Sequence, residues 1–245
     1  MIEAVVFDWG GTLSAFADVD LGDMWRLAAR HLDPDREDEL CRRLAEVEDA
    51  SFARTRTDQR SSTLSQILRT ASDALGLDVA EAVLEEAATH HLDSWTPHIV
   101  HEPDAGPVLE TLKGWGLRTG LLSNTHWPRA FHEHFLERDG LAELLDVRLY
   151  TSELPRMKPH PSVFEVALAE LDVMEPERAV FVGDRPWDDI HGARSVGLRT
   201  VLRRNRAVPG YDVEPDAVID ELGELPAILE RWGVGAPAAG PDSGP

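Results

Sequence analysis

The stretch VVFDWGGTL, residues 5–13, joins a short run of β-branched and aromatic residues to Asp8 and then to the pair Gly10-Gly11. A short apolar run followed by glycines is typical of a buried strand that enters a tight loop. We therefore expect a strand over residues 2–7, with Asp8 at the start of the loop that follows its carboxyl end.

The same pattern returns in the second half of the chain, where short apolar runs alternate with segments of helical periodicity. The apolar runs are RTGLL, DVRLY, AVFVG, LRTVL and AVI, and a last helix is expected near ELPAILERW. Strands and helices that alternate at this spacing indicate a parallel sheet with right-handed crossovers. We expect a doubly wound α/β fold built from residues 1–13 and 98–232.

The segment between these two parts has a different pattern. Over residues 21–95 apolar side chains recur at intervals of three and four, with breaks at Pro34 and Gly76, which predicts four helices and no strand. Residues 14–97 are therefore expected to form a helical insertion after the first strand. The last stretch, residues 233–245, is rich in Gly and Pro without periodicity and is expected to be disordered.

Composition narrows the possible classes of protein. A chain of 245 residues with 42% hydrophobic residues can build one full-sized core and a modest inserted module. The formal net charge of −21 would repel nucleic acids and anionic membrane surfaces, so we expect neither as a partner. No run approaches the roughly 20 apolar residues that cross a bilayer. With Cys41 as its one cysteine and a start unlike a secretory signal, we expect a cytoplasmic protein, whose oligomeric state stays open.

Four polar residues are expected to meet at one edge of the sheet. Asp8, Ser123 and Asp184 each follow an apolar run, and ligands of open parallel sheets bind beyond the carboxyl ends of the strands. Lys158 lies in the loop after DVRLY, just before a helix, from which its ammonium group can reach the same crevice. Lysine is rare in this chain, with two lysines against 22 arginines, so its occurrence in this loop is informative.

This combination suits a phosphate ester as substrate. A carboxylate can attack phosphorus only if charge repulsion is neutralised, which a divalent cation held by oxygen ligands achieves. Asp8 would be both nucleophile and metal ligand, and Asp184 would complete the metal site with Asp188 or Asp189. The Ser123 hydroxyl and backbone N–H groups would hold the non-bridging oxygens, while Lys158 stabilises the developing charge.

Four segments resemble, in order, the motifs of the haloacid dehalogenase superfamily: FDWGGTL, LLSNT, MKPHPSVF and VGDRPWDDIHGA. The resemblance covers the α/β core from end to end, and the helical insertion is similar to the α-helical cap of that family. It implies a Rossmann-like core with a cap that selects the substrate.

The resemblance also implies a function and its residues. It points to a hydrolase, either a Mg²⁺-dependent phosphatase or a phosphotransferase, acting on a small phosphorylated metabolite through an aspartyl-phosphate at Asp8. It favours Asp189 over Asp188 as the supporting ligand and adds the backbone carbonyl of Gly10 to the metal site. Within the motifs, we expect substrate contacts from Gly11, Thr12 and Asn124. In the insertion, we expect them from Arg54 and Arg56, whose alternative role is to form a solvated helix face.

One motif position departs from the family pattern. Family phosphatases carry a second aspartate two residues after the nucleophile, which protonates the leaving group and then activates water; this chain has Gly10 there. General acid–base catalysis is typically worth about 10²–10⁴-fold. Substrates with poor leaving groups should therefore react slowly, whereas acyl phosphates should be less affected. His126 is the candidate for a substitute proton donor, although it could be an ordinary surface histidine.

Two subfamilies that also lack this aspartate are less compatible with the sequence. Phosphonoacetaldehyde hydrolases need a cap lysine, and residues 1–112 contain none. Haloacid dehalogenases replace the acidic fourth motif by a Ser and Asn pair, whereas Asp184 is retained here, so dehalogenation is a less favoured alternative. A catalytically reduced binding or regulatory protein is another alternative; Gly10 favours it, and the retention of Asp8 and Lys158 opposes it.

The histidine pairs suggest a zinc site only weakly. His90-His91, His98 with His101, and His132 with His134 lack the Cys or carboxylate spacing of a closed tetrahedral zinc site, so we predict none.

Overall fold

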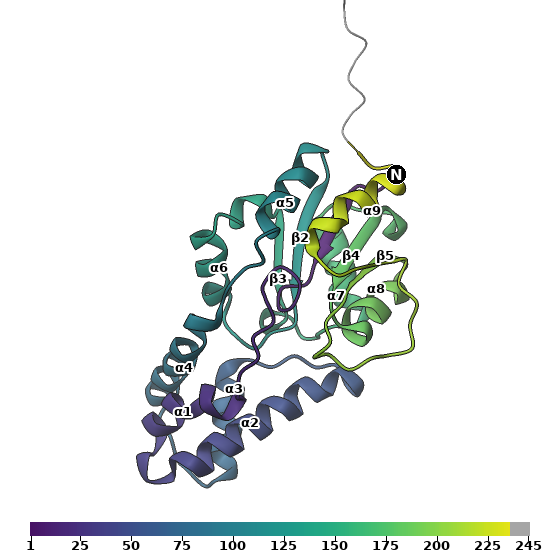
Figure 1. Ribbon diagram of the computed structural model, residues 1–245. Helices are drawn as coiled ribbons and strands as arrows, with labels where there is room; N and C mark the ends of the chain where they lie inside the picture. The colour runs from purple at the N-terminus through teal and green to yellow at the C-terminus, as the bar shows by residue number, and fades with distance from the viewer. Residues whose placement is uncertain (236–245) are drawn as a thin grey trace, which may run out of the picture.

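The structure is a computed structural model that describes residues 1–235 (Figure 1). The tail for which the sequence predicts disorder, residues 233–245, falls from position 236 onward outside the described residues. No helix within residues 1–235 is both long and apolar enough to span a bilayer.

One parallel sheet forms the centre of the described part of the chain, which confirms the predicted α/β class. Its strand order is β3-β2-β1-β4-β5-β6, so the chain moves outward on one side of β1 and then returns to its other side. The strands are β1 (Ala4–Phe7), β2 (Arg118–Ser123), β3 (Val147–Tyr150), β4 (Ala179–Gly183), β5 (Arg199–Arg203) and β6 (Ala217–Ile219). Because β1 pairs with both β2 and β4, the topological switch lies beside β1, where such folds bind ligands.

Helices cover both faces of the sheet. Alternate residues of β1 point to opposite faces, so Val5 and Phe7 join one apolar cluster and Ala4 and Val6 join another. The first cluster also contains residues of α5, α6 and α9, and the second contains residues of α7 and α8. The bounds are α5 (Ala105–Gly114), α6 (Arg129–Arg138), α7 (Pro161–Glu170), α8 (Gly192–Ser195) and α9 (Leu225–Arg231).

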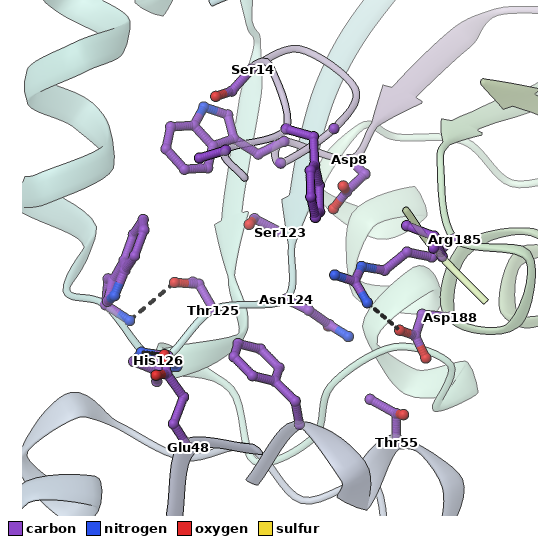
Figure 2. Close-up of a pocket in the computed structure, with 18 of the residues that line it drawn as sticks. Asp8, Ser14, Glu48, Thr55, Ser123, Asn124, Thr125, His126, Arg185 and Asp188 are labelled. Atoms are coloured by element: carbon purple, nitrogen blue, oxygen red, sulfur yellow. Dashed lines mark hydrogen bonds and ion pairs between the residues drawn. The ribbon is translucent and has the colours of Figure 1, made fainter. Parts of the chain in front are cut away.

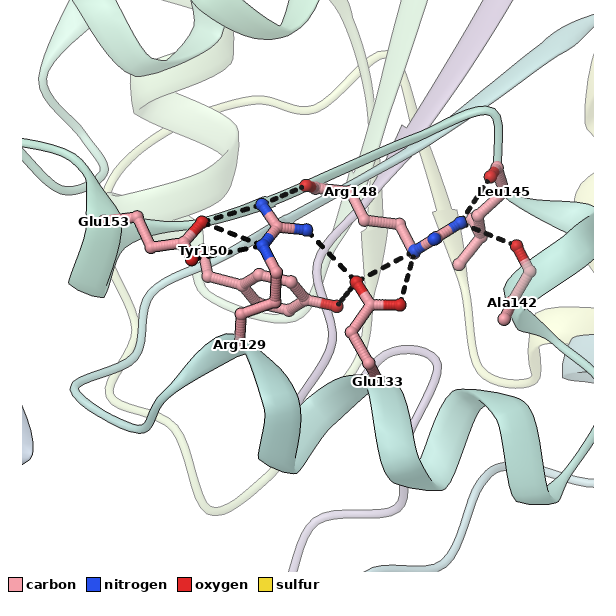
Figure 3. Close-up of polar contacts among 7 residues, drawn as sticks. All are labelled: Arg129, Glu133, Ala142, Leu145, Arg148, Tyr150 and Glu153. Carbon is pink, nitrogen blue, oxygen red and sulfur yellow. Dashed lines mark hydrogen bonds and ion pairs between the residues drawn. The ribbon is translucent and has the colours of Figure 1, made fainter.

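The edge strand β3 is tied to α6 by a network of charged side chains (Figure 3). Glu133 accepts hydrogen bonds from Arg129 and Arg148 and from the Tyr150 hydroxyl at 3.1 Å. The Arg129 guanidinium also pairs with Glu153 at 2.7 Å. These contacts hold the edge of the sheet next to the loop that follows β2.

The insertion forms four α-helices, as the periodicity predicts. These are α1 (Leu21–Leu32), α2 (Glu37–Ala53), α3 (Leu64–Ala74) and α4 (Glu81–Trp95). They have their own apolar core, which includes Trp25, Leu44 and Leu68. Figure 1 shows this bundle below the sheet, on the side where the carboxyl ends of β1 and β2 lie. The insertion therefore faces the edge where the polar residues are expected.

Candidate active site

The carboxylates of Asp8, Asp184 and Asp189 meet beyond the carboxyl ends of β1 and β4. β1 and β4 lie in register, with Phe7 opposite Val182, so the residues that follow them emerge side by side. One oxygen from each carboxylate lies within 4.8 Å of the others, and all three residues are buried. The sequence prediction that Asp8 and Asp184 converge is thus reproduced by the geometry.

Lys158 lies at the centre of this group. Its Nζ is 2.6 Å from Oδ1 of Asp8 and 2.7 Å from Oδ1 of Asp189. The Asn124 side chain holds the Lys158 backbone by donating to its carbonyl at 2.9 Å and accepting from its N–H at 2.8 Å. Burial alone would lower the pKa of Lys158, but the charges of Asp189 and Asp8 raise it, so the side chain stays cationic.

The carboxylates carry more negative charge than Lys158 balances. Burial, followed by the charges of Asp8 and Asp189, raises the pKa of Asp184 to about 7. Burial also raises the pKa of Asp8, against the opposing effect of Lys158. Oδ2 of Asp184 accepts a hydrogen bond from Asn205 at 2.6 Å, whereas its buried Oδ1 has no partner among the described residues. These oxygens fit a hard divalent cation such as Mg²⁺, which is bound through carboxylates.

Two glycines allow the carboxylates to approach the backbone closely. Gly11 has a φ of 82°, and a Cβ at this position would collide with Oδ2 of Asp184. A Cβ at Gly183 would likewise collide with the carboxylate of Asp189. Gly10 differs, because a Cβ there would meet nothing within 4 Å. The site therefore requires Gly11 and Gly183, while position 10 has room for a side chain.

Asp188 and Asp189 point to different places, although they are neighbours in the π-helical segment Pro186–His191. Asp189 joins the three-carboxylate group, and its Oδ2 accepts from the N–H of Arg185 at 2.9 Å. Asp188 lines a cavity instead, with its Oδ2 4.0 Å from Nη1 of Arg185 (Figure 2). The geometry thus groups Asp189, and not Asp188, with Asp8 and Asp184.

Arg185 is a charged residue of the site that the sequence interpretation missed. It lines the cavity, and the charges of Asp184 and Asp188 raise its pKa against the effect of burial. Its position directly after Gly183-Asp184 was the available signal. The Arg185 guanidinium can therefore attract an anionic group that enters the cavity beside the carboxylates.

The cavity between the core and the insertion has a volume of about 710 Å³. Much of its wall is apolar, formed by Trp9, Phe16, Phe52, Trp95 and Trp127 among others. Polar groups of the site, including Asp8 and Ser123, line the same cavity. Figure 2 shows these groups at one side of the cavity and the insertion at the other.

The predicted substrate-binding residues divide into two groups. Gly11, Asn124 and Arg56 line the cavity, although the Arg56 guanidinium stacks 4.5 Å from the ring centre of Trp187. Two others do not line it. Arg54 donates to the backbone carbonyl of Ser61 at 3.1 Å, and Thr12 is fully buried. Thr12 and Arg54 therefore do not reach the cavity wall, although Thr12 belongs to a motif and Arg54 is charged.

His126, the predicted substitute proton donor, is not at the surface. It is buried in the cavity wall, and its Nε2 lies 3.0 Å from Oε1 of Glu48 in the insertion. Figure 2 shows His126 beside Glu48 and on the opposite side of the cavity from Asp8.

Comparison with known proteins agrees with this geometry. The family model of haloacid dehalogenase-like hydrolases matches residues 2–197. The glyceraldehyde 3-phosphate phosphatase of Pyrococcus furiosus is 33% identical over 140 residues, which cover 53% of this chain and 54% of that protein. The (S)-2-haloacid dehalogenase 1 of a Pseudomonas species is 34% identical over 131 residues, covering 53% and 56%. The chain thus spans about half the length of these relatives.

Solved structures match over nearly the whole chain. A HAD phosphatase from Thermococcus onnurineus has a TM-score of 0.63 and 26% identity, covering 96% of this chain and 100% of that one. A 2-haloacid dehalogenase from Pseudomonas syringae has a TM-score of 0.66 and 26% identity, covering 95% and 100%. From its α/β core, its helical insertion and its four motifs in order, the chain belongs to the haloacid dehalogenase-like hydrolases.

Proposed function

We propose that this hydrolase is a Mg²⁺-dependent phosphatase that acts on small phosphorylated metabolites with apolar, good leaving groups. The observation that carries the proposal is the buried group of three carboxylates around Lys158, with one oxygen of Asp184 left without a partner among the described residues. The phosphatases among its relatives also support it.

The proposed reaction has two steps, both at Asp8. A carboxylate oxygen of Asp8 attacks phosphorus, and the bond to the leaving group breaks with the electron pair departing on the leaving oxygen. Water then attacks the phosphorus of the aspartyl-phosphate, which releases inorganic phosphate and restores Asp8. Lys158 offsets charge on Asp8 during the attack, and the Ser123 hydroxyl can donate to a non-bridging oxygen.

The proposed metal site consists of Asp8, Asp184, Asp189 and the backbone carbonyl of Gly10. Mg²⁺ bound there would offset the negative charge of the nucleophile and of the phosphoryl oxygens.

Gly10 and the cavity wall together restrict the substrate. Without an acid at position 10, the leaving group must depart with little protonation, which favours aryl and acyl phosphates over alkyl esters. The aromatic wall formed by Trp9, Phe52, Trp95 and Trp127 suits an apolar leaving group better than a sugar. We therefore expect aryl phosphates to be hydrolysed faster than sugar phosphates.

Dehalogenation of 2-haloacids is a second candidate. It is favoured by the (S)-2-haloacid dehalogenases among the relatives and by a cavity that suits small apolar acids. It needs no acid at position 10. The three-carboxylate group argues against it, because displacement of halide does not require the metal that such a group binds.

One assay separates these candidates. Phenyl phosphate, glucose 6-phosphate and 2-chloropropionate are each offered to the protein with Mg²⁺ and with a chelator. We expect Mg²⁺-dependent release of phosphate from phenyl phosphate and far slower release from glucose 6-phosphate. Release of chloride in the presence of chelator would favour the dehalogenase. No turnover of any of the three would favour a binding or regulatory role.

A further inference from the structure

A second group of polar side chains lies at the interface between the insertion and the core, on the opposite side of the cavity from Asp8. Glu48 comes from α2, His91 from α4, and His126 from the loop after β2. Figure 2 shows Glu48 and His126 side by side. One ligand atom from each lies within 4.8 Å of the others. Their exposed fractions are 2%, 0% and 4%, so the group is almost closed to solvent.

His91 is a buried polar residue whose ring nitrogens are poorly paired. Neither nitrogen meets strict hydrogen-bond geometry with a partner within residues 1–235, although the backbone of Met24 and the carboxylate of Glu48 lie close enough to influence the pKa of the ring. Burial lowers the pKa of His91 to about 3, so the imidazole is neutral with a free lone pair. A buried polar group left poorly paired is destabilising, and a bound ligand would remove that cost.

Glu48 and His126 lie in direct contact. Nε2 of His126 lies 3.0 Å from Oε1 of Glu48, and His126 lowers the pKa of Glu48 against the opposing effect of burial, although the contact falls outside strict hydrogen-bond geometry. Two ligand atoms bonded at about 2.0 Å to one tetrahedral ion would lie about 3.3 Å apart. The observed separation therefore suits two neighbouring ligands of one metal ion.

Trp25 fixes the orientation of two members of the group. Its Nε1 donates to Oε2 of Glu48 at 2.7 Å, which leaves Oε1 turned toward His126. Its ring stacks on His91, with 3.6 Å between centroids and an interplanar angle of 19°. Outer contacts of this kind commonly orient the ligands of metal sites.

We propose that Glu48, His91 and His126 bind one zinc-class dication that ties the insertion to the core. Two imidazoles and a carboxylate form a known zinc ligand set, and imidazole nitrogen prefers such ions over Mg²⁺. The ion would fix α2 and α4 against the end of β2 and the following loop, which carry Ser123 and Asn124. The three residues are far apart in the sequence, which is why no local spacing predicts the site. The inference does not depend on the proposed phosphatase activity.

The test uses the full chain, stripped of metal and then kept in excess Mg²⁺ so that the Asp8 carboxylate group is occupied. Co²⁺ is titrated in while the visible absorption is followed, and Zn²⁺ is then added as competitor. We expect one Co²⁺ per chain, with the intense absorption of a four- or five-coordinate site, and full displacement by Zn²⁺.

Matched variants assign the binding to these residues. His91→Phe keeps the stack on Trp25 but should weaken Co²⁺ binding by more than about 100-fold, beyond the 10–100-fold that loss of an outer contact costs. His90→Phe changes the neighbouring residue, whose ring contacts His31, and should leave the affinity unchanged. Glu48→Gln, which keeps an acceptor for Trp25, should also weaken binding and replaces His91→Phe if that variant does not fold.

Three results would overturn the site. The first is that the wild-type protein takes up no Co²⁺ in excess Mg²⁺. The second is a weak Co²⁺ absorption typical of six oxygen ligands. The third is an equal affinity for Co²⁺ in the wild type and in Glu48→Gln. Each would show that the three side chains are a metal-free polar cluster.

Discussion

Nζ of Lys158 lies 2.6 Å from Oδ1 of Asp8, although 150 positions separate the two residues in the chain. Their side chains are 1% and 7% exposed, so this is a buried ion pair. Removing one partner of such a pair leaves an uncompensated charge and costs about 3–5 kcal/mol. We predict that Lys158→Met lowers the free energy of unfolding by about this amount at neutral pH, measured by urea denaturation, and abolishes turnover.

Lys113 provides a matched control, because it is the other lysine of the chain. Its Nζ lies 3.3 Å from Oδ1 of Asp146, but both side chains are more than one third exposed. Exposed pairs of this kind contribute about 0–1 kcal/mol. Lys113→Met should therefore change stability by less than about 1 kcal/mol and leave turnover intact. Equal losses in the two variants would argue against a special role for the Lys158 pair.

Position 10 can accept the general acid that it lacks. A Cβ at Gly10 would meet nothing within 4 Å, and the residue does not have a positive φ. We predict that Gly10→Asp folds normally and raises kcat/KM for a sugar phosphate by up to about 10²–10⁴-fold, with a much smaller effect on an aryl phosphate. Equal effects on both substrates would contradict the assignment of leaving-group protonation to this position.

Gly11 should be far less tolerant than its neighbour. It has a φ of 82°, and an added Cβ would collide with Asp184. We predict that Gly11→Ala displaces Asp184 and abolishes the rise in melting temperature that Mg²⁺ produces, whereas Gly10→Ala retains this rise. The measurement is thermal unfolding with and without Mg²⁺. A normal response to Mg²⁺ in Gly11→Ala would show that the close approach is dispensable.

Asp184 should make stability depend on pH. In the absence of Mg²⁺ its folded pKa is raised from 3.8 to about 7, first by burial and then by Asp8 and Asp189. Between these values the folded protein holds a proton that the unfolded chain has lost, so this group lowers stability as pH rises. Mg²⁺ binds the deprotonated form, and its stabilising effect should therefore grow over the same range.

The corresponding variant is Asp184→Asn, which keeps an oxygen acceptor for Asn205. In chelator at pH about 8, where wild-type Asp184 is ionised, we predict that the variant melts at a higher temperature than wild type. We also predict no response of the variant to Mg²⁺. A variant that is less stable than wild type in chelator would show that Asp184 is not destabilised by burial and repulsion.

The sequence was informative wherever function depends on residues next to the ends of strands. Asp8 and Asp184 follow apolar runs, and the parallel register of β1 and β4 brings them together as predicted. The four helices of the insertion follow from periodicity. Contacts between the insertion and the core were not predictable, because they depend on how two separate apolar faces pack.

The residues that were missed or misplaced illustrate this limit. Arg54 and Arg56 differ by two positions, yet Arg56 lines the cavity and Arg54 binds the backbone of Ser61. His126 was expected to be a proton donor or a surface residue, and it is buried against Glu48, a residue of the insertion. No local pattern links residues that meet only after the insertion docks on the core.

We propose that Asp8 forms an aspartyl-phosphate and that this intermediate is hydrolysed slowly, because Gly10 supplies no base for the attacking water. Because Gly10 affects both the departure of the leaving group and the activation of water, an aryl phosphate should react fast in the first step and slowly in the second. Rapid-quench measurement of phenol release from phenyl phosphate in Mg²⁺ tests this directly. We predict a burst of one phenol per chain, with phosphate recovered on the peptide that contains Asp8, and neither signal in Asp8→Asn. Steady turnover by Asp8→Asn, or phosphate bound to another residue, would show that the reaction does not pass through an aspartyl-phosphate at Asp8.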